Sequence, residues 1–333
     1  MGILESFLLP TSQSMVKFLW GLNGGNPEYN LGDSGCLLYS ERKEGERGMR
    51  IGLIDIDSKI PNLALMKLSQ YHKQLNHKVE LTSPLFAQNG KFDLVMASKV
   101  FTFSEMPILP KGSIVGGSGI DLKKTIDPID TIYPDYDLYH CDYAMGFTTR
   151  GCNRRCPWCI VPKKEGKFRI IGDIYNFWNG QTRIILLDNS LNTDENHFLK
   201  ICDQIERNNI AIDFNQGLDI RYLTDVQAMA LNNLRLWKQI HFAWDSMSIE
   251  YAVRKGIGIL HKYHLNHKSM FYVLIGFNTT PDEDFYRIDI LKGLEIDPFV
   301  MPYNKFDEYQ RKFARWVNHK AIFKSVEWKD YVE

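Results

Sequence analysis

The chain has 333 residues, which is enough for one large domain or two moderate ones. Hydrophobic residues make up 44% of it and charged residues 24%, the ordinary composition of a soluble globular protein. Its 40 basic and 40 acidic residues give a formal net charge of zero, so no overall field favours nucleic acid or an anionic membrane. No apolar run reaches the roughly eighteen residues of a membrane-spanning helix, and we expect no membrane association.

Residues 1–48 show no hydrophobic periodicity, and we interpret them as an irregular N-terminal extension. They contain glycine-rich turns and a run of charges between Glu41 and Arg47. A clear buried-strand pattern begins only after Met49. Two interpretations stay open: the native protein begins at Met49 and the preceding residues come from an over-extended reading frame, or they form a genuine N-terminal arm.

Residues 49–140 predict a small α/β domain. Strands that alternate with helical segments indicate a parallel, Rossmann-like sheet. A helix is expected from about Pro61, where proline suits the first turn, and the glycines between Gly116 and Gly119 form either an anion cradle or a tight turn. The apolar runs that we assign to strands are 50–56, 79–82, 92–98 and 113–119.

Residues 141–304 predict the largest domain. Six buried-strand patterns recur there, and helical patterns lie between them, which suits an α/β fold with an open, partial TIM-type (β/α)6 barrel. Thr193 and Thr224 are expected to cap two of the helices, with Val226 and Met229 on the inner side of the second. The predicted strands are 143–147, 183–187, 211–214, 239–243, 270–275 and 299–301.

Cys152, Cys156 and Cys159 follow the first of these strands in a C-x3-C-x2-C spacing. Thiolates this close can converge on one metal centre without closing a long loop. A structural zinc and a purely electron-transferring four-iron cluster each take four ligands, whereas a four-iron cluster held by three leaves one iron open to a small molecule. The alternative is a zinc-binding nucleic-acid module, with His140 or Cys141 as fourth ligand.

The aromatic Trp158 before the third cysteine gives C-x3-C-x-aromatic-C, which resembles the signature of the radical S-adenosylmethionine (radical SAM) superfamily. The resemblance implies a 4Fe-4S cluster whose open iron chelates S-adenosylmethionine. It also implies reductive cleavage of that cofactor to a 5'-deoxyadenosyl radical, which abstracts hydrogen from a substrate. The partial barrel over 141–304 is what this family implies as well.

The remaining cysteines, Cys36, Cys141 and Cys202, are scattered and suggest no disulfide framework. This favours a reducing, cytoplasmic location, which an oxygen-labile cluster also needs. The absence of three further clustered cysteines disfavours a methylthiotransferase. The N-terminal domain resembles a shortened cobalamin-binding domain, but it lacks an Asp-x-His-x-x-Gly motif, so cobalamin is doubtful.

Polar residues follow the predicted barrel strands at the end where parallel barrels place their active sites. A polar cofactor needs such a rim, although strand ends also turn polar at any protein surface. The candidate rim residues are Asp188, Asn189, Ser190, Asp219, Arg221, Asp245 and Gly276.

The family resemblance implies roles for several of them. Asp188, Asn189 and Ser190 occupy the position of a Gly-Gly-Glu segment that contacts the amino group of the cofactor. Trp158 would flank the cluster and the adenine, and Gly276 would let the backbone approach the adenine ring.

The other rim residues carry charge. Arg221 would pair with the methionine carboxylate, because a guanidinium matches a carboxylate bidentately. Asp219 or Asp245 would bind ribose or substrate, or would only cap local structure.

The loop around the cysteines is basic, with Glu165 as its lone acid. Nearby cations would stabilise the reduced form of an anionic cluster. The same patch can dock an acidic reductant such as flavodoxin or ferredoxin, bind RNA, or be merely solvated; sparse aromatics weaken the RNA interpretation. The substrate, whether small molecule, peptide or RNA, stays open. The basic residues are Arg150, Arg154, Arg155, Lys163, Lys164, Lys167 and Arg169.

Residues 305–333 predict a C-terminal helical segment. Tyr309, Phe313, Trp316 and Val317 fall on one side of a helix over 307–323. We expect this helix to pack on the barrel or to close its open side.

Overall fold

The structure is a computed structural model that describes residues 48–123, 126 and 129–332. Apart from Gly48, the extension predicted over residues 1–48 lies outside the described residues. The chain from Arg47 onward forms one compact unit.

The N-terminal part of this unit is a parallel sheet, as its alternating pattern predicts. Its elements are β1 (Arg50–Asp55), α2 (Leu63–Gln74), β2 (Lys78–Leu81), α3 (Pro84–Ala87), β3 (Leu94–Ser98) and β4 (Ile114–Gly116). The strand order is β2-β1-β3-β4. The central strands β1 and β3 are buried, which explains their nearly continuous apolar sequences.

The start of α2 differs from the prediction, and the glycines after β4 decide between the two predicted alternatives. Helix α2 begins after Asn62, whose side chain accepts from the backbone N–H groups of Ala64 and Leu65, so Pro61 precedes the cap and is not in the first turn. Gly117 has φ +101°, and a Cβ on it would collide with the carbonyl of Lys99. The glycines after β4 therefore serve a tight turn against the chain that follows β3.

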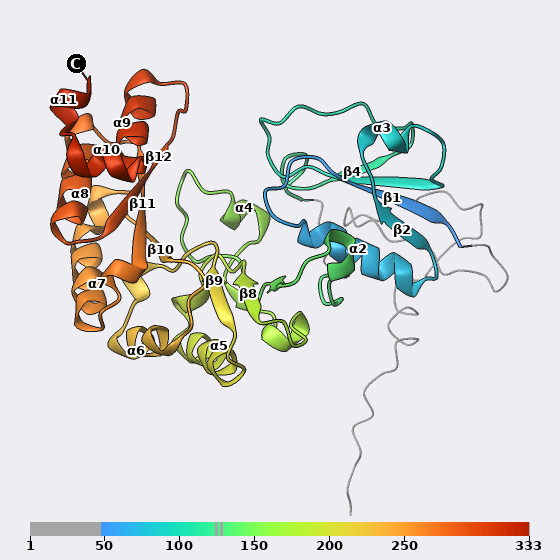
Figure 1. Ribbon diagram of the computed structural model, residues 1–333, viewed down its shortest axis with the longest axis horizontal. Coiled ribbons are helices and arrows are strands. Elements are labelled where there is room, and N and C mark those ends of the chain that lie inside the picture. Colours follow the sequence, from blue (N-terminus) through green and yellow to red (C-terminus); the bar gives the residue numbers. More distant parts are fainter. Residues whose placement is uncertain (1–47, 124–125, 127–128, 333) are drawn as a thin grey trace, which may run out of the picture. The chain divides into compact units, whose positions relative to one another are not determined.

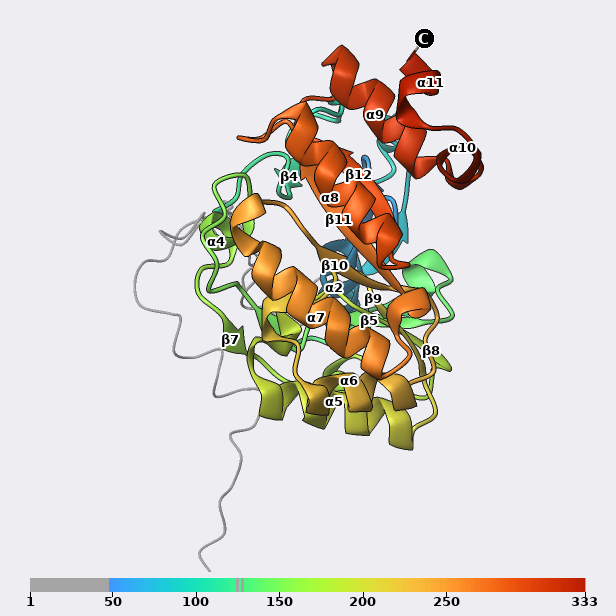
Figure 2. The same ribbon diagram turned by 90° about the vertical axis from the view of Figure 1, so that its left-hand side faces the viewer.

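The C-terminal part is an open partial barrel that contains all six predicted strands. Its elements are β5 (Ala144–Gly146), β8 (Arg183–Leu186), α5 (Glu195–Arg207), β9 (Ala211–Phe214), α6 (Asp225–Asn233), β10 (Ile240–Ala243), α7 (Glu250–Lys262), β11 (Ser269–Ile275), α8 (Pro281–Gly293) and β12 (Asp297–Pro302). The strands form two parallel sheets, β5-β8-β9 and β10-β11-β12. Helices α5 to α8 cover one face of these strands (Figures 1 and 2).

The two three-stranded sheets join at β9 and β10. The N–H of Leu218 donates to the carbonyl of His241 (2.8 Å), and Ile212 forms an isolated parallel bridge with Leu236. These contacts continue the hydrogen-bonded surface across six strands, as expected for an open barrel.

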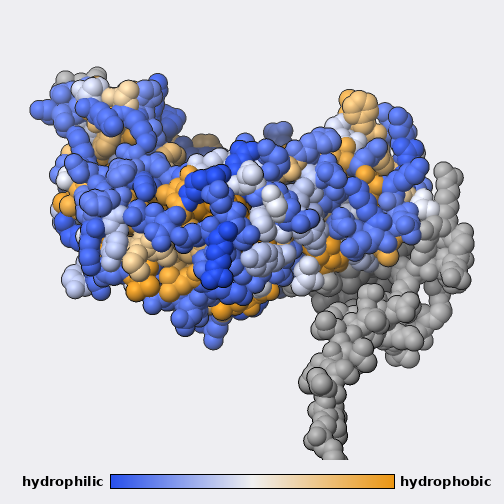
Figure 3. Space-filling model, turned by 60° about the horizontal axis from the view of Figure 1, so that its bottom comes forward, coloured by the Kyte–Doolittle hydropathy of each residue, from blue (hydrophilic) through white to orange (hydrophobic). Residues whose placement is uncertain are grey.

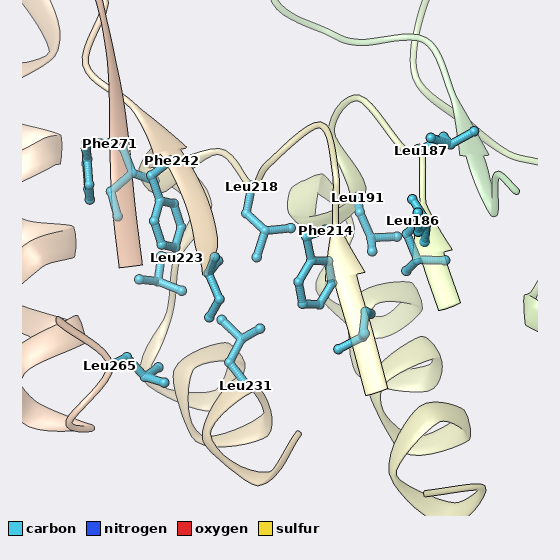
Figure 4. Close-up of a cluster of buried hydrophobic side chains, with 14 of the residues drawn as sticks. Leu186, Leu187, Leu191, Phe214, Leu218, Leu223, Leu231, Phe242, Leu265 and Phe271 are labelled. Atoms are coloured by element: carbon cyan, nitrogen blue, oxygen red, sulfur yellow. The ribbon is translucent and has the colours of Figure 1, made fainter. Parts of the chain in front are cut away.

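The core lies between the strands and their helices. Phe214, Phe242 and Phe271 come from three successive strands, point toward the helix side and are at most 3% exposed (Figure 4). Cys202 on α5 is 2% exposed and belongs to the same core, as predicted. It is a packing residue.

Two helix predictions fail in detail. Helix α5 is capped by Asp194, whose side chain accepts from the N–H of His197, and not by Thr193. Helix α6 is capped by Thr224 as predicted, but Val226 and Met229 are 45% and 54% exposed. The buried side instead contains Gln227, which exchanges hydrogen bonds with Asn192. That buried amide pairing fixes the rotation of α6.

The C-terminal segment forms three helices, α9 (Glu308–Asn318), α10 (Lys320–Ser325) and α11 (Trp328–Val332). The predicted single helix is broken at His319. Phe313, Trp316 and Val317 are at most 2% exposed, as predicted. The side chain of Asn318 pairs with both backbone groups of Val300 on β12, so α9 covers the free edge of that strand.

The surface shown in Figure 3 is mostly hydrophilic, with smaller apolar patches. Within the described part of the chain, no helix has both the length and the apolar character that crossing a bilayer requires.

Candidate cluster-binding site

The three cysteines lie in residues 151–168, here called the cysteine loop. It is closed at its base by the antiparallel strands β6 (Thr149–Arg150) and β7 (Arg169–Ile170), and it contains the short helix α4 (Val161–Lys164). The loop is also closed by Glu165, whose Oε2 accepts from the N–H of Gly151 (3.0 Å). The N–H of Cys152 donates to the carbonyl of Gly166 (3.2 Å). The backbone that presents the cysteines is therefore constrained at both ends.

Asp188 anchors the chain just before this loop. Its Oδ1 accepts four hydrogen bonds, from the backbone N–H and the hydroxyl of both Thr148 and Thr149, at 2.5–3.0 Å. The Thr148 hydroxyl also contacts Nε2 of His197 (3.1 Å). Asp188 is 3% exposed, and burial raises the pKa of its carboxyl although the threonine donors oppose this. Its side chain is enclosed by protein and positions β6.

The residues next to Asp188 are also engaged. The amide of Asn189 donates to Oε2 of Glu165 (3.0 Å), so it helps to close the cysteine loop. Ser190 is 2% exposed, and its hydroxyl lies 2.6 Å from that of Thr193. The side chains of Asn189 and Ser190 thus support the loop and the following turn.

The three thiols are free and half-buried. The N–H of Arg154 donates to Sγ of Cys152 (3.3 Å), and the N–H of Val161 donates to Sγ of Cys159 (3.5 Å). The N–H of Cys159 donates to the carbonyl of Cys156 (3.0 Å). Backbone donors directed at sulfur stabilise negative charge on a thiolate or on a thiolate-bound cluster.

The thiols share one electrostatic environment with two rim residues. Burial raises the pKa of Cys156, the guanidinium of Arg221 opposes this, and Cys159, Asp245 and Cys152 raise it further. Burial also raises the pKa of Cys159, with added contributions from Cys152 and Asp245. The structure therefore brings Arg221 and Asp245 close to the cysteines, as expected for rim residues.

The zinc alternative can be compared with the geometry of the cysteine loop. Among the described residues, no three His, Cys, Asp or Glu side chains converge tightly enough to hold one metal ion. Zinc would need four ligands at about 2.0–2.3 Å. His140 and Cys141 precede β5, whereas Cys152 follows it, and the Cys141 thiol contacts the carbonyl of Tyr143. The predicted fourth zinc ligand therefore lies at the wrong end of β5.

Asp219 connects the cysteine loop to the end of β9. It pairs with Nε and Nη2 of Arg221 (2.7 and 2.8 Å) and with Nε of Arg154 from the loop (3.2 Å). The Arg154 guanidinium also lies over the ring of Tyr222, 4.7 Å from its centroid. The backbone of Asp219 exchanges two hydrogen bonds with Asn192 after β8. Asp219 thus connects the cysteine loop, Arg221 and the segment that follows β8.

Asp245 follows β10 and is held by its neighbours. Its Oδ1 accepts from the N–H of Leu274 (3.2 Å). Burial raises the pKa of its carboxyl, while this N–H and Arg287 oppose the rise. Arg287 is fully buried, pairs with Asp284 (2.6 Å), and donates to the carbonyls of Trp244 and Leu274. Helix α8 thereby fixes the strand ends on both sides of Asp245.

An aromatic row crosses the rim from the cysteine loop. The ring of Trp158 meets that of Phe277 edge-on (5.1 Å between centroids), and Phe277 meets Tyr303 in the same way (4.8 Å). Gly276, next in the chain to Phe277, has φ +75°. A Cβ on Gly276 would collide with the side chain of Gln310 on α9. The space that a Cβ of Gly276 would fill is therefore occupied by Gln310 and is not open to a ligand.

The basic residues of the loop divide into two groups. Arg150 and Arg154 form ion pairs, and Arg169 donates to the carbonyl of Glu165. Within the described residues, no ion pair or side-chain hydrogen bond involves the other four. These free cations are Arg155, Lys163, Lys164 and Lys167.

Several residues that build the site were not evident from the sequence. Glu165 stands out there only as a lone acid among cations, although such an acid is expected to be paired. Asn192, Asp130 and Lys67 carry no sequence signal, because they reach the site from separate elements. Proximity of this kind is set by the fold alone.

Comparison with known proteins adds to this picture. No family model matches the sequence. A curated relative, the tRNA-2-methylthio-N(6)-dimethylallyladenosine synthase of Hydrogenobaculum sp. (strain Y04AAS1), is 24% identical over 243 residues, covering 64% of this chain and 55% of the relative. The chain therefore spans about half the length of the curated relative that it matches.

A solved structure shares the fold. The radical S-adenosylmethionine methyltransferase TsrM from Kitasatospora setae, with cobalamin and a 4Fe-4S cluster bound, aligns with a TM-score of 0.57 and 11% identity, over 77% of this chain and 72% of that one. The aligned 77% of this chain is more than residues 141–333 could supply, so the aligned region includes part of the N-terminal sheet. The cysteine motif, the sequence match and the fold of the chain are thus all similar to those of radical S-adenosylmethionine enzymes.

Proposed function

We propose that this protein is a radical SAM enzyme in which Cys152, Cys156 and Cys159 hold one 4Fe-4S cluster. It would reductively cleave S-adenosylmethionine to a 5'-deoxyadenosyl radical that abstracts hydrogen from a substrate still to be identified. One observation carries the proposal: three half-buried free thiols lie in one clamped loop, after the first strand of an open barrel. Three ligands would leave an iron open for the cofactor.

The rim residues would orient the cofactor. When bound, the cluster supplies the electron that cleaves the sulfonium. Arg221 keeps its Nη1 without a hydrogen bond among the described residues while Asp219 holds its other edge, so this group would donate to the methionine carboxylate. Asp245 would accept from ribose or substrate hydroxyls, and Trp158 would flank the adenine and shield the cluster from water.

The cofactor's amino group would be bound by backbone groups. Asp188 and Ser190 are buried and engaged, which favours the carbonyl of Asn189 as the acceptor. Gly276 would serve chiefly to seat Gln310. These assignments refine the roles that the family resemblance implies for this part of the rim.

The four free cations of the cysteine loop would dock an acidic reductant such as flavodoxin or ferredoxin. Arg155, Lys163, Lys164 and Lys167 are exposed and form no ion pair among the described residues, although Lys164 lies within electrostatic range of Glu165. Exposed cations steer acidic partners toward an adjoining redox centre. RNA is a second class of ligand for the same cations, since the curated relative is a tRNA-modifying synthase.

Cobalamin is not part of the proposal. TsrM was solved with cobalamin, but in this chain the glycines after β4 are packed against the segment that follows β3. The Asp-x-His-x-x-Gly motif is absent from the sequence. Cobalamin added to the purified protein is therefore expected to separate from it on a desalting column and to elute later, with the small molecules.

Anaerobic reconstitution with iron and sulfide tests the proposed function. The protein should become brown, bind about four irons per chain, and release 5'-deoxyadenosine from S-adenosylmethionine with dithionite. Cys152→Ala should lose iron and cofactor cleavage and stay folded, because Cys152 is a half-buried loop residue. Cys141→Ala, which removes a half-buried thiol outside the loop, should keep both. A colourless protein with one zinc would point instead to the zinc-binding nucleic-acid module.

A further inference from the structure

Four alternating charges connect helix α2 to the cysteine loop. Lys67 on α2 pairs with Oδ1 of Asp130 (2.7 Å), and Nη2 of Arg150 pairs with Oδ2 of Asp130 (2.9 Å). Nη1 of Arg150 pairs with Oε1 of Glu165 (3.3 Å). We call these four residues the charge chain. It ends on the acid that closes the loop holding Cys152.

The charge chain is shielded from solvent along its length. The side chains of Lys67, Asp130, Arg150 and Glu165 are 10%, 17%, 15% and 8% exposed. Two positive and two negative charges balance, which makes burial of all four tolerable. Burial alone would raise the pKa of Asp130, but Arg150 and Lys67 hold it below its usual range. Low exposure means that salt and water weaken these pairs little.

Contacts other than the ion pairs also hold the charge chain in place. Lys67 also donates to the backbone carbonyl of Asp130. The central carbon of the Arg150 guanidinium lies over the ring of Phe147, 3.4 Å from its centroid. The second oxygen of Glu165 accepts from Gly151 and Asn189. A displacement of α2 would therefore be transmitted to the backbone immediately before Cys152.

We propose that the charge chain is a positioning device through which the N-terminal sheet domain holds the cysteine loop in its cluster-receiving conformation. This inference rests on the proposed function, because only a protein that binds a cluster has a cluster-receiving conformation. It gives residues 49–140 a role that requires no ligand of their own. Lys67, Asp130, Arg150 and Glu165 are positioning residues, since none of them is a cluster ligand.

Asp130→Asn tests the proposal, because it leaves Lys67 and Arg150 without their shared partner. Asp135→Asn is the matched control: Asp135 is 6% exposed and pairs with Lys73 of the same helix (2.6 Å), but it makes no ion pair with the cysteine loop. The full-length, cluster-free protein is compared by hydrogen–deuterium exchange. We expect residues 150–168 to exchange on the order of tenfold faster in Asp130→Asn and to be unchanged in Asp135→Asn.

A second variant covers the case in which Asp130→Asn does not fold. Lys67→Met removes the far end of the charge chain with a side chain of similar length, and Lys67 is remote in sequence from the loop. Lys67→Met should also make residues 150–168 exchange faster than in the unmodified protein, as Asp130→Asn does. Equal exchange in the loop for Asp130→Asn and Asp135→Asn, or a change spread evenly over all segments, would overturn the proposal.

Iron retention separates this inference from the proposed function. After reconstitution, Asp130→Asn should lose iron to a chelator several-fold faster than Asp135→Asn and the unmodified protein. If the unmodified protein binds no iron, the proposed function fails. The exchange measurement on cluster-free protein still decides whether the charge chain holds the loop.

Discussion

At the scale of single residues, burial decides which acids of the rim are available to a ligand. Asp188 lies at the end of β8 but is enclosed, and one of its oxygens accepts four hydrogen bonds. Its other oxygen, Oδ2, has no hydrogen-bond partner among the residues that the structure describes. Asp219 and Asp245 are only half-buried and lie beside the cysteine loop. A polar residue at a strand end is therefore not necessarily directed at the site.

Asp188→Asn is expected to cost less stability than Asp188→Ala, because its amide oxygen can still accept from Thr148 and Thr149 while only its NH2 group, in the buried place of Oδ2, lacks an acceptor among the described residues. The carboxylate charge that this substitution removes forms no ion pair with any described residue. Asp188→Ala should cost about 3 kcal/mol or more, since it leaves several buried donors unsatisfied. Urea denaturation of both variants measures the difference. Equal losses in the two variants would show that the carboxylate charge itself is needed.

His72 on α2 should make the protein sensitive to acid. It is 4% exposed, and its Nδ1 has no hydrogen-bond partner in the described part of the chain. Burial lowers its pKa to about 4, and His77 adds to the shift. The unfolded chain, with a pKa near 6.5, therefore binds a proton before the folded chain does. Stability is lost as the pH falls from 6.5 toward 4, by up to about 3 kcal/mol.

Comparison with His72→Leu isolates this contribution from that of other groups. The stability of His72→Leu relative to the unmodified protein should rise steadily between pH 6.5 and pH 4 in urea titrations. His267→Gln, which changes an exposed histidine, should show no such trend. A constant difference between His72→Leu and the unmodified protein over this range would contradict the assignment.

At the scale of secondary-structure elements, the open barrel depends on how helices close against strand ends. Arg287 on α8 binds the carbonyls that flank Asp245, and Asn318 on α9 pairs with the edge of β12. Gln310 on α9 fills the space beside Gly276 and accepts from the N–H of Asn304. The helices therefore set the geometry of the rim as much as the strands do.

Gly276→Ala is expected to destabilise the protein by about 2 kcal/mol or more, because Ala at positive φ is strained and its Cβ displaces Gln310. The same change made in a Gln310→Ala background should cost less, since the clash is then removed and only the backbone strain is left. Thermal denaturation measures both. If Gly276→Ala weakened S-adenosylmethionine binding without lowering the melting temperature, the direct contact with adenine would be the better account.

At the scale of the whole molecule, the chain from Arg47 onward forms one compact unit that contains the N-terminal parallel sheet and the parallel sheets of the open barrel. The charge chain and the contacts of Tyr136, whose hydroxyl donates to the carbonyl of Phe177 (2.6 Å), connect the two. The N-terminal sheet is thereby part of the structure that supports the cysteine loop.

A chain that starts at Met49 is expected to fold and to bind iron as the full-length chain does, because the compact unit begins at Arg47 and β1 begins at Arg50. Its melting temperature and its iron content after reconstitution provide the measurement. Loss of soluble protein on deletion of residues 1–48 would favour the genuine N-terminal arm.

The sequence by itself determined the six barrel strands and the N-terminal parallel sheet, and it predicts the metal-binding role proposed for Cys152, Cys156 and Cys159. These features depend on local periodicity and on ligand spacing, which are properties of contiguous residues. The rotation of α6 could not be predicted in this way, because the buried Gln227 is stabilised by Asn192, which lies 35 residues away.

Only the tertiary structure decided which polar residues face the site. In the folded protein Asp188 is enclosed, and the side chain of Gln310 occupies the space beside Gly276. The fold also brings together the four residues of the charge chain, Lys67, Asp130, Arg150 and Glu165. Hydrogen bonds and ion pairs act over a few ångströms. Residues far apart in sequence form such contacts only when the fold brings their elements together. The spacing of residues along the chain therefore does not predict them.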